Sequence, residues 1–403
     1  MRMFQRAFML ILCALNLQNG QKCLLNTRKD FGEPLPVIVR DGKLLEPTDS
    51  FGNVEMNYGD TLTLSCEGTG NINHPNVQRP LAVATISCEG GDIFKNDAWL
   101  NEPSRFFLFK CNYSPQHKSR RTERLCYDGN PIIEVGYVVD SHFYPVYESC
   151  FNEASLNVLY SKYTQKPYNA LYQTKIDRPY FIADDQFGYI PVDTLFSPRG
   201  QKAAVSKLVG SVIDNYVTPT QFLSRGHLAA KTDFVFAFGE RATFHYVNCA
   251  PQWVGFNGGN WNTLEVDLRN HIHVAGYNTI IYTGIFGISH LQNADGRKIE
   301  LFLYTDENNN PVIPVPLFYY KVVYEPQRKC GIVFVGINNP YVSSTEAHQM
   351  FFCEDLCRGN RDLSWLSWHP DSAAEGYTFC CTVPDFRNTV PHLPPFDVDC
   401  VLT

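Results

Sequence analysis

The sequence predicts an α+β protein built around a mixed or antiparallel sheet. Apolar residues alternate with polar ones in short runs along both halves of the chain, which is the period of a strand. Two segments of the second half instead show the spacing of a helix. The 403 residues are enough for two domains, and six of the 14 cysteines lie from Cys23 to Cys150.

The chain begins with a segment typical of a secretory signal peptide. Met1 to Arg6 is basic, Ala7 to Leu15 is apolar, and the small Gly20 stands at the exit. We assign residues 1–20 to this signal; a buried N-terminal helix is the alternative. No other apolar run is long enough to cross a bilayer, so we expect a secreted, extracellular protein without membrane contact, in the gut lumen or in saliva.

Residues 21–150 are expected to form a small β-rich domain held together by disulfides. Gly, Pro and Asn punctuate its apolar runs. The expected strands are Thr61–Cys66, Leu81–Ile86, Phe106–Phe109 and Ile132–Val139. The boundary is placed near residue 150, although no linker marks it, and residues 151–403 form the second domain.

The second domain mixes both periods. We expect a helix over Lys202–Val212, where Ala204, Leu208 and Val212 share one side, and another from Trp261 to about His271. The expected strands are Phe234–Phe236, Thr279–Tyr282, Leu317–Val323 and Ile332–Val335.

The cysteine count leaves one thiol without a partner inside the chain. Cys13 would leave with the signal peptide, so an odd number of the 14 cysteines remains. The pairs Cys353, Cys357 and Cys380, Cys381 could bind zinc, but their spacing differs from common zinc pairs and we favour disulfides. Cys249 is expected to be a disulfide partner, because no base beside it would make it a nucleophile.

The net charge of −7 does not favour a protein whose whole surface binds nucleic acid. A local basic groove with a divalent cation can still attract phosphate on such a surface. The most basic stretch, Lys118–Arg124, is expected to be a solvated loop, with a phosphate-binding patch as the alternative.

A set of polar residues in the second domain carries the chemistry. Its members are Arg225, Gly226, His227, Asn248 to Gln252, Asn257, Trp261, Glu265 and Arg269. A neutral His227 can take a proton from water near pH 7, and Arg225 can bind two phosphate oxygens at once. Gly226 is expected to leave room for the substrate backbone. These groups fit metal-assisted cleavage of a phosphodiester.

Asn257 is the candidate metal ligand, because its amide oxygen suits a hard cation and Mg²⁺ takes few protein ligands. On one straight helix, Glu265 would lie about 12 Å from it, so we expect Glu265 to orient a metal-bound water instead. Trp261, Glu265 and Arg269 share one helix face, where Trp261 is expected to be a packing anchor. Glu265 and Arg269 also have the spacing of an ordinary ion pair. His271 and His273 are expected to be ordinary surface or helix-end histidines.

The stretch Phe222–Arg269 resembles the active-site core of the DNA/RNA non-specific endonuclease family. That family's signature is Asp-Arg-Gly-His, then Asn-x-x-Pro-Gln, then Asn, Trp, Glu and Arg at intervals of four residues. The chain matches it in register with Ser224 to His227, Asn248 to Gln252, and Asn257 to Arg269. A looser likeness covers roughly residues 150 to 385.

Two departures from the family pattern stand out. Ser224 replaces the usual Asp, and the family's upstream phosphate-binding arginine has no confident counterpart. With Ser224 and the segment Phe256–Trp261, the chain resembles secreted arthropod nucleases, including the gut double-stranded-RNA nucleases of insects.

The resemblance implies a ββα-metal nuclease (His-Me finger) that cleaves DNA and RNA, duplex and single-stranded, with Mg²⁺ or with Mn²⁺ in its place. It implies His227 as the general base and Asn257 as the metal ligand, with Arg225, Glu265 and Arg269 supporting catalysis. We expect Arg225, Arg269 and Gln252 to contact the substrate. The alternative is a secreted nucleic-acid-binding protein of the same fold with little turnover. A disulfide-bonded structural protein would fit residues 21–150 alone.

Overall fold

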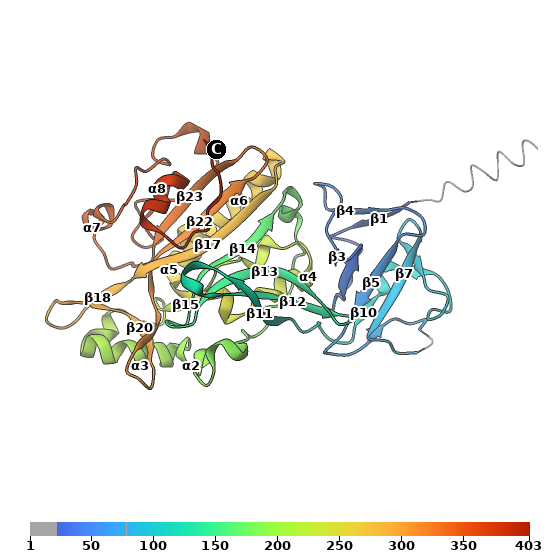
Figure 1. Ribbon diagram of the computed structural model, residues 1–403, viewed down its shortest axis with the longest axis horizontal. Coiled ribbons are helices and arrows are strands. Elements are labelled where there is room, and N and C mark those ends of the chain that lie inside the picture. Colours follow the sequence, from blue (N-terminus) through green and yellow to red (C-terminus); the bar gives the residue numbers. More distant parts are fainter. Residues whose placement is uncertain (1–21, 78) are drawn as a thin grey trace, which may run out of the picture.

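The computed structural model describes residues 22–77 and 79–403, so the predicted signal peptide over residues 1–20 lies outside the described residues. A small part made of strands lies at one end of an elongated molecule, and a larger α+β part forms the rest (Figure 1). The predicted α+β class is confirmed. In the part of the chain that the structure describes, no helix is both long enough and apolar enough to cross a membrane.

The small part, residues 23–111, is called the N-terminal module below. Six of its strands pair in the order β3-β2-β5-β7-β8-β9, and β1–β4 and β6–β10 form two further pairs. The strand bounds are β1 (Cys23–Asn26), β2 (Val37–Arg40), β3 (Lys43–Leu44), β4 (Asn53–Met56), β5 (Thr61–Ser65), β6 (Ile72–Asn73), β7 (Val83–Gly90), β8 (Ile93–Lys95), β9 (Ser104–Arg105) and β10 (Lys110–Cys111).

Two of the strands predicted here are confirmed and one is wrong. Thr61–Cys66 is β5, and Leu81–Ile86 overlaps the start of β7. Phe106–Phe109 is not a strand, because Phe106–Leu108 forms the 3-10 helix η1. Phe106 and Phe109 are both buried and lie 6.2 Å apart between ring centroids, so these positions, three residues apart, turn into the same aromatic core.

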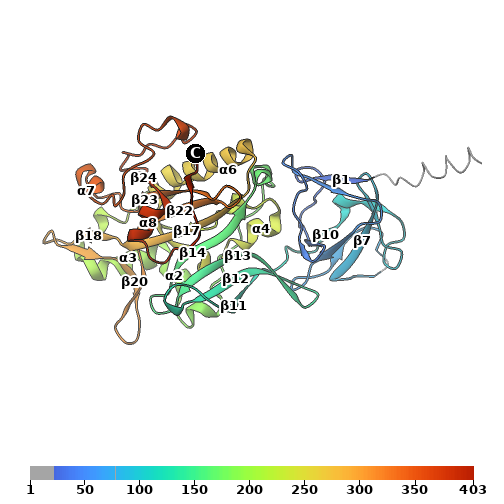
Figure 2. The same ribbon diagram turned by 45° about the horizontal axis from the view of Figure 1, so that its top comes forward.

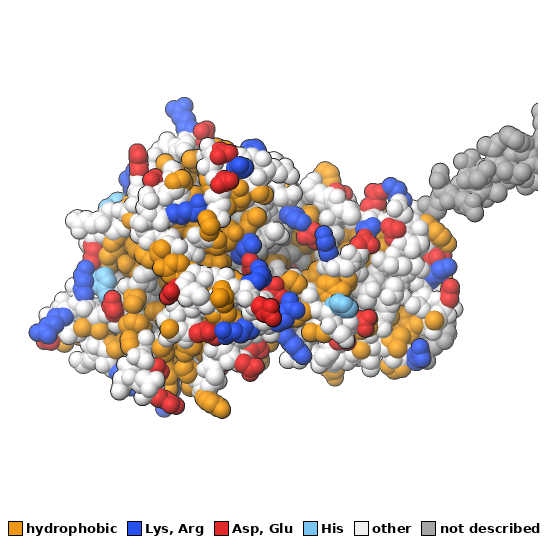
Figure 3. Space-filling model, viewed as in Figure 1, with side chains coloured by type: hydrophobic (Ala, Val, Ile, Leu, Met, Phe, Trp, Pro, Cys, Tyr) orange, Lys and Arg blue, Asp and Glu red, His pale blue; other side chains and the backbone are white. Residues whose placement is uncertain are grey.

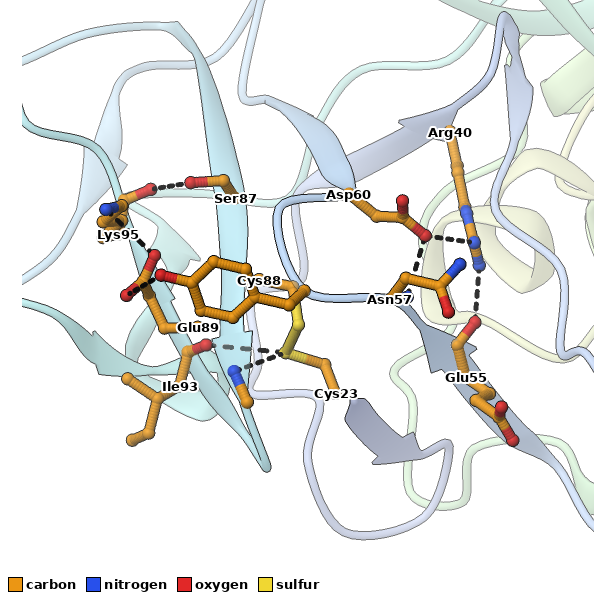
Figure 4. The surroundings of a disulfide bond; sticks show 12 residues. Cys23, Arg40, Glu55, Asn57, Asp60, Ser87, Cys88, Glu89, Ile93 and Lys95 are labelled. Carbon is orange, nitrogen blue, oxygen red and sulfur yellow. Dashed lines mark hydrogen bonds and ion pairs between the residues drawn. A yellow bond between two sulfur atoms is a disulfide. The ribbon is translucent and has the colours of Figure 1, made fainter. Parts of the chain in front are cut away.

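Two disulfides hold the N-terminal module together. Cys23–Cys88 joins β1 to β7, as Figure 4 shows, and Cys66–Cys111 joins the residue after β5 to β10. Closing a loop of 65 residues, as the first bond does, removes about 4 kcal/mol of entropy from the unfolded chain in the loop-closure account. A module of this size has a small core, so such bonds contribute much of its stability.

The larger part is built on a nine-stranded sheet. The order is β11-β12-β13-β14-β17-β22-β23-β24, and β25 runs parallel to β23 while the other pairs are antiparallel, so the predicted mixed sheet is confirmed. The bounds are β11 (Lys118–Leu125), β12 (Pro131–Val139), β13 (His142–Asn152), β14 (Asn157–Gln165), β17 (Thr279–Ile288), β22 (Pro316–Glu325), β23 (Cys330–Ile337), β24 (Thr378–Cys381) and β25 (Cys400–Val401). The strands predicted at Ile132, Thr279, Leu317 and Ile332 are therefore confirmed.

This sheet extends across the position at which the sequence placed the domain boundary. Residue 150 lies inside β13, and β13 pairs with β14. A cut there would divide the sheet. We propose that the two parts of the chain meet between β10 and β11, near residue 115.

The basic stretch Lys118–Arg124 is a strand, so its prediction as a loop is wrong. It is the edge strand β11, where charged side chains discourage pairing with another chain. Arg120 pairs with Glu134, and Arg124 with Glu134 and Glu148. Acidic and basic side chains are likewise interspersed over the face in Figure 3. These acidic partners argue against the alternative of a phosphate-binding patch.

Both faces of the central strands β22 and β23 are buried. Alternate residues of a strand point to opposite sides of the sheet. On β22, Tyr319 and Val323 belong to one core with helix α6 (Asn262–Ala275), whereas Tyr320 and Val322 belong to a second core with helix α8 (Val383–Thr389). Figure 2 shows α6 running along the strands of the sheet. The central strands are consequently almost continuous apolar runs.

The remaining helices and strands are short. Their bounds are α2 (Val192–Leu195), α3 (Pro198–Val209), β15 (Leu223–His227), α4 (Ala237–Ala242), β16 (Cys249–Trp253), α5 (Val254–Phe256), β18 (His290–Gln292), β19 (Lys298–Glu300), β20 (Phe302–Thr305), β21 (Pro311–Pro314) and α7 (Ser344–Gln349). The helix predicted at Lys202–Val212 is α3, which begins earlier because Ser197 caps it by accepting a hydrogen bond from Gly200 N.

The strand predicted at Phe234–Phe236 is wrong, since these residues form bends before α4. Their aromatic rings pack on different neighbours. Phe234 contacts Tyr163, with ring centroids 5.6 Å apart, and Phe236 stacks on Phe238 at 5.4 Å. Tertiary packing of the rings, rather than a strand ladder, decides this backbone.

Disulfides account for all but one of the described cysteines. The bonds of the larger part are Cys126–Cys150, Cys330–Cys400, Cys353–Cys381 and Cys357–Cys380, which confirms disulfides over zinc at the last four. Cys249 is a free, buried thiol, so its prediction as a disulfide partner is wrong. The other described cysteines pair among themselves, which leaves it no partner in residues 22–77 and 79–403.

This pairing makes a testable prediction for protein produced from Gln21 onward. We expect one thiol per chain to react with a thiol reagent in denaturant without reductant, and none in the folded protein, because Cys249 is only 6% exposed. Cys249→Ser should abolish the signal. More than one thiol in denaturant would contradict the six bonds.

Candidate active site

A hairpin followed by a helix forms the candidate site. Strands β15 and β16 pair antiparallel, with His227 opposite Cys249 and Ser224 opposite Gln252. The chain then passes through α5 and a π-helical turn, Asn257–Trp261, into α6. The Tyr319 hydroxyl donates to the backbone oxygen of Ala250 at 2.8 Å, which fastens the hairpin to the sheet. The order β15, β16, α6 is the predicted ββα arrangement.

The imidazole of His227 lies between two aromatic rings. The centroid of Phe181 is 5.0 Å away and that of Phe244 is 4.9 Å away. Burial lowers the pKa of His227 to about 3, and the positive charges of Arg178 and Lys231 act in the same direction. Its Nε2 is buried and has no hydrogen-bond partner among the described residues. The ring is therefore neutral at pH 7, with a free nitrogen lone pair.

Arg225 lies on the same face of β15 as His227, two residues away. Its Nε donates to the Tyr246 hydroxyl at 2.7 Å, and a terminal nitrogen donates to Asp193 Oδ1 at 2.7 Å. The guanidinium also packs against the ring of Phe181. This side chain is thus already bound to an exposed carboxylate, and only the rest of its donors are available to a phosphate.

Gly226 and Gln252 are packed against each other inside the protein. A Cβ at Gly226 would lie 2.3 Å from Gln252 Oε1 and 2.7 Å from the Tyr319 hydroxyl, so glycine is needed for packing inside the protein. The prediction that it leaves room for substrate is wrong. Gln252 has no exposed surface, and its side chain packs directly against Gly226. This position favours a packing role over contact with substrate.

Asn257 has one half of its amide engaged. Its Nδ2 donates to Ser224 Oγ at 2.9 Å, and Ser224 Oγ in turn donates to the backbone oxygen of Gln252 at 2.8 Å. Among the described residues no group donates to Asn257 Oδ1. The amide oxygen is therefore available, and an oxygen donor of this kind fits the hard divalent cation that the resemblance implies.

The π-helical turn that carries Asn257 is held by the C-terminal part of the chain. Asn260 Nδ2 donates to the backbone oxygens of His369 and Gly376 at 2.8 and 2.6 Å. A Cβ at Gly259 would lie 2.7 Å from Glu375 Cα, so this close approach requires glycine. Trp261 is 1% exposed and packs against Tyr319, which confirms it as a packing anchor.

Glu265 and Arg269 lie in a cluster of charges between α6 and the sheet. Burial raises the pKa of Glu265 above its usual range, and the nearby Lys321 opposes this effect. Arg269 is buried, donates from Nε to Asp233 Oδ1 at 3.1 Å, and donates to Thr232 Oγ1 at 2.6 Å. Its guanidinium is thus committed to the protein, which favours a positioning role over direct contact with substrate.

Three cations near this site were not identified from the sequence. Arg178 is exposed, lies 5.4 Å from the ring centroid of Phe244, and has no carboxylate partner among the described residues. Lys231 acts electrostatically on His227, and Lys321 is fully buried in β22. A lysine inside the apolar run Leu317–Val323 was a signal for the last of these; Arg178 had none.

The two histidines of α6 do not form a metal pair. His271 stacks on Trp365 with ring centroids 4.3 Å apart, and His273 Nδ1 lies 2.8 Å from the backbone oxygen of Pro167. Residues two apart on a helix point in different directions. His273 lies in the last turn of α6, as expected for a helix-end histidine, and both side chains are half-buried.

Comparison with known proteins identifies the family. Residues 128–386 match the sequence profile of the DNA/RNA non-specific endonuclease family. The chain belongs to this family. It is therefore a nuclease, and the family uses a divalent metal ion and acts on nucleic acid.

Several relatives are salivary proteins of insects. The chain is 30% identical to a salivary endonuclease of Lutzomyia longipalpis, over 92% of this chain and 85% of that protein. It is 27% identical to salivary protein Tsal2A of Glossina morsitans morsitans, over 93% and 92%. A salivary endonuclease of Culex quinquefasciatus is 28% identical over 43% and 45%. A solved chain from an EndoG/EndoGI complex aligns over 48% of this chain and 71% of that chain, with 20% identity and a TM-score of 0.33.

The buried position of His227 leads to a prediction for the metal-free protein. We expect its ring protons to show no titration between pH 8 and pH 5 in NMR spectra, because burial and two nearby cations hold its pKa near 3. Since a lowered pKa favours the neutral ring in the folded state, this stabilisation is present above pH 6.5 and decreases as the pH falls below it. Comparison with His227→Gln assigns the resonance. A midpoint near 6.5 would contradict the prediction.

Proposed function

We propose that this endonuclease is secreted and hydrolyses phosphodiester bonds of both DNA and RNA, including double-stranded RNA, with Mg²⁺ as its preferred ion. The observation that carries the proposal is the unpartnered Nε2 of His227, neutral at pH 7 and placed beside exposed and half-buried cations. A base next to positive charge, on a ββα hairpin, is what hydrolysis of a polyanion requires.

His227 is the general base in this proposal. Its Nε2 takes a proton from a water molecule, the water oxygen forms a bond to phosphorus, and the bond from phosphorus to the leaving oxygen breaks. The Phe181 and Phe244 rings fix the imidazole and exclude bulk water from one side. The leaving oxygen takes a proton from solvent.

Phosphate charge is neutralised by Arg178 and by the free donors of Arg225. Arg178 is the better candidate for direct contact, because it is exposed and no described carboxylate competes for it. Arg178 would then correspond to the family's upstream phosphate-binding arginine, for which the sequence showed no confident counterpart. Neither group selects a base, so cleavage should depend on the backbone and not on sequence.

Asn257 would hold the divalent cation through Oδ1, with Mn²⁺ able to replace Mg²⁺. When bound, such an ion supplies positive charge at phosphorus and acidifies water. Ser224 orients the Asn257 amide, which explains how the family's usual Asp can be replaced here. Glu265 would orient a water molecule at this site, and Arg269 would act through its charge on Glu265 and Lys321.

Secretion is supported by three features. The first residues have the pattern of a signal peptide, six disulfides are formed among the described cysteines, and the named relatives are salivary proteins. We therefore propose an extracellular site of action, in saliva or in the gut lumen.

The first test is cleavage of plasmid DNA and of long double-stranded RNA. With Mg²⁺ we expect both to be degraded, and with EDTA or with His227→Ala we expect a loss of about 10²-fold or more, typical of removing a general base. Full Mg²⁺-dependent cleavage by His227→Ala would contradict the assigned base. Retarded gel mobility without product would instead favour the nucleic-acid-binding protein.

A second test concerns Ser224. Ser224→Ala removes the hydrogen bond that orients Asn257, so we expect the Mg²⁺ concentration for half-maximal activity to rise about 10-fold or more, as for the loss of a ligand's supporting partner. The matched control is Ser206→Ala, a half-buried serine of α3 whose hydroxyl donates to a backbone oxygen of its own helix. Equal Mg²⁺ requirements in both variants would remove Ser224 from the proposed metal site.

A further inference from the structure

The N-terminal module packs against the nuclease part at several points. Thr27 Oγ1 donates to the backbone oxygen of Leu171 at 3.2 Å, and Glu46 pairs with Lys166 at 2.7 Å. The Phe31 ring lies 4.9 Å from that of Phe236. These contacts attach the module to the surface of the nuclease. One more contact, between Glu33 and Arg241, connects the module to a residue near the active site.

Glu33 shares a guanidinium with a residue next to the active site. Arg241, on α4, donates to Glu33 Oε2 at 2.7 Å and to Asp177 Oδ1 at 2.5 and 2.8 Å. The Arg241 side chain is only 7% exposed. A cation with so little solvent depends on its carboxylates, so Glu33 helps to fix where Arg241 points and therefore where Asp177 lies.

Asp177 directly precedes Arg178, the cation beside His227. The segment before it is fastened to the loop after His227, since Gln173 N donates to the backbone oxygen of Val235 and Lys231 Nζ donates to that of Ile176 at 2.7 Å. The proline that follows Arg178 restricts its backbone to extended conformations. With Asp177 bound to Arg241 and the residues on both sides of Arg178 constrained, the backbone from which the Arg178 side chain extends is held in place.

We propose that the N-terminal module is a structural part of the substrate site: Glu33, through Arg241 and Asp177, holds Arg178 in position to bind a backbone phosphate of the nucleic acid. This inference rests on the proposed function of Arg178. Glu33 is a positioning residue, because it acts through two others and does not touch substrate. It gives the module a role in binding that its disulfide-bonded sheet alone does not suggest.

A purely stabilising role of the module makes a different prediction. Glu46–Lys166 is an ion pair across the same interface, but neither residue has a hydrogen bond or ion pair to residues 173–178 among the described residues. If the module only stabilises the nuclease, loss of Glu33 or of Glu46 should have the same kind of effect. If Glu33 positions Arg178, only its loss should change how the protein binds phosphate.

The experiment is a double-mutant cycle of binding to a fluorescent 20-base-pair DNA, in a His227→Ala background that suppresses cleavage. The variants are E33Q, R178Q, the pair E33Q/R178Q, and E46Q as the matched control. The dissociation constant is measured over a series of salt concentrations, together with the thermal midpoint. Glu33 is partly exposed, so E33Q is expected to fold.

We expect R178Q to weaken binding and to lower the slope of log Kd against log salt by about one, the signature of one lost phosphate contact. E33Q should weaken binding a few-fold to about 30-fold and lower the slope in the same direction, yet have no further effect in R178Q protein. E46Q should change neither quantity. In protein with His227 intact, E33Q should raise KM and leave kcat unchanged.

The proposal is overturned if E33Q weakens binding equally with and without Arg178, or if it lowers the thermal midpoint without changing Kd or the salt slope. Binding is measured without His227, so failure of the wild-type protein to cleave would contradict the proposed catalysis and still leave this cycle readable.

Discussion

The buried carboxylate of Asp233 is the interaction on which the site depends. It is 2% exposed, and its oxygens accept hydrogen bonds from Tyr163 at 2.6 Å, Gln165 at 3.1 Å and Arg269 at 3.1 Å. Its backbone oxygen accepts another from Asn169. One residue thus joins strand β14, helix α6 and the loop after His227. Removing one partner of such a buried network typically costs about 3–5 kcal/mol, because a charge is left without compensation.

Because Asp233 fixes α6 against the sheet, it also fixes the residues that α6 presents. Arg269 neutralises Asp233, and Lys321 from β22 lies on the other side of the cluster, donating to Tyr163 and Thr283. Burial lowers the pKa of Lys321, whereas the charges of Asp233 and Glu265 favour its protonated form. Two cations and two carboxylates therefore share one buried space, and the charge state of Glu265 depends on all of them.

The arginines near the site differ in whether a carboxylate already binds them. Arg225, Arg241 and Arg269 each have carboxylate partners at 2.5 to 3.1 Å, so they mainly hold structure together. Arg178 has none among the described residues, and it is exposed beside His227. An arginine without a partner is the one that a phosphate can bind without displacing an existing ion pair. A search for active-site arginines by sequence motif alone selects the paired ones.

Much of the fold and of the site could be predicted from the chain. Thr61–Ser65 follows from period-two alternation and Leu317–Val323 from a short apolar run rich in aromatic and β-branched residues. The order of two strands and a helix was implied by the resemblance of Phe222–Arg269 to the endonuclease family. Lys118–Arg124 was misjudged because its charges are paired by acids on neighbouring strands. Phe234–Phe236 was wrongly predicted as a strand because the two rings pack against different neighbours, Tyr163 and Phe238.

By itself, the sequence determined the order of the motif residues, the local faces they share, and an odd cysteine count once the predicted signal peptide is set aside. Such properties depend on neighbours within a few positions. Only the tertiary structure decided that Cys249 is the free thiol, that Arg269 is bound by Asp233, and that Arg178 is exposed without a carboxylate partner among the described residues. The partners that settle these points lie far away along the chain, 36 residues for Arg269 and Asp233. Short-range spacing does not encode such contacts, because they form only when the sheet brings distant segments together.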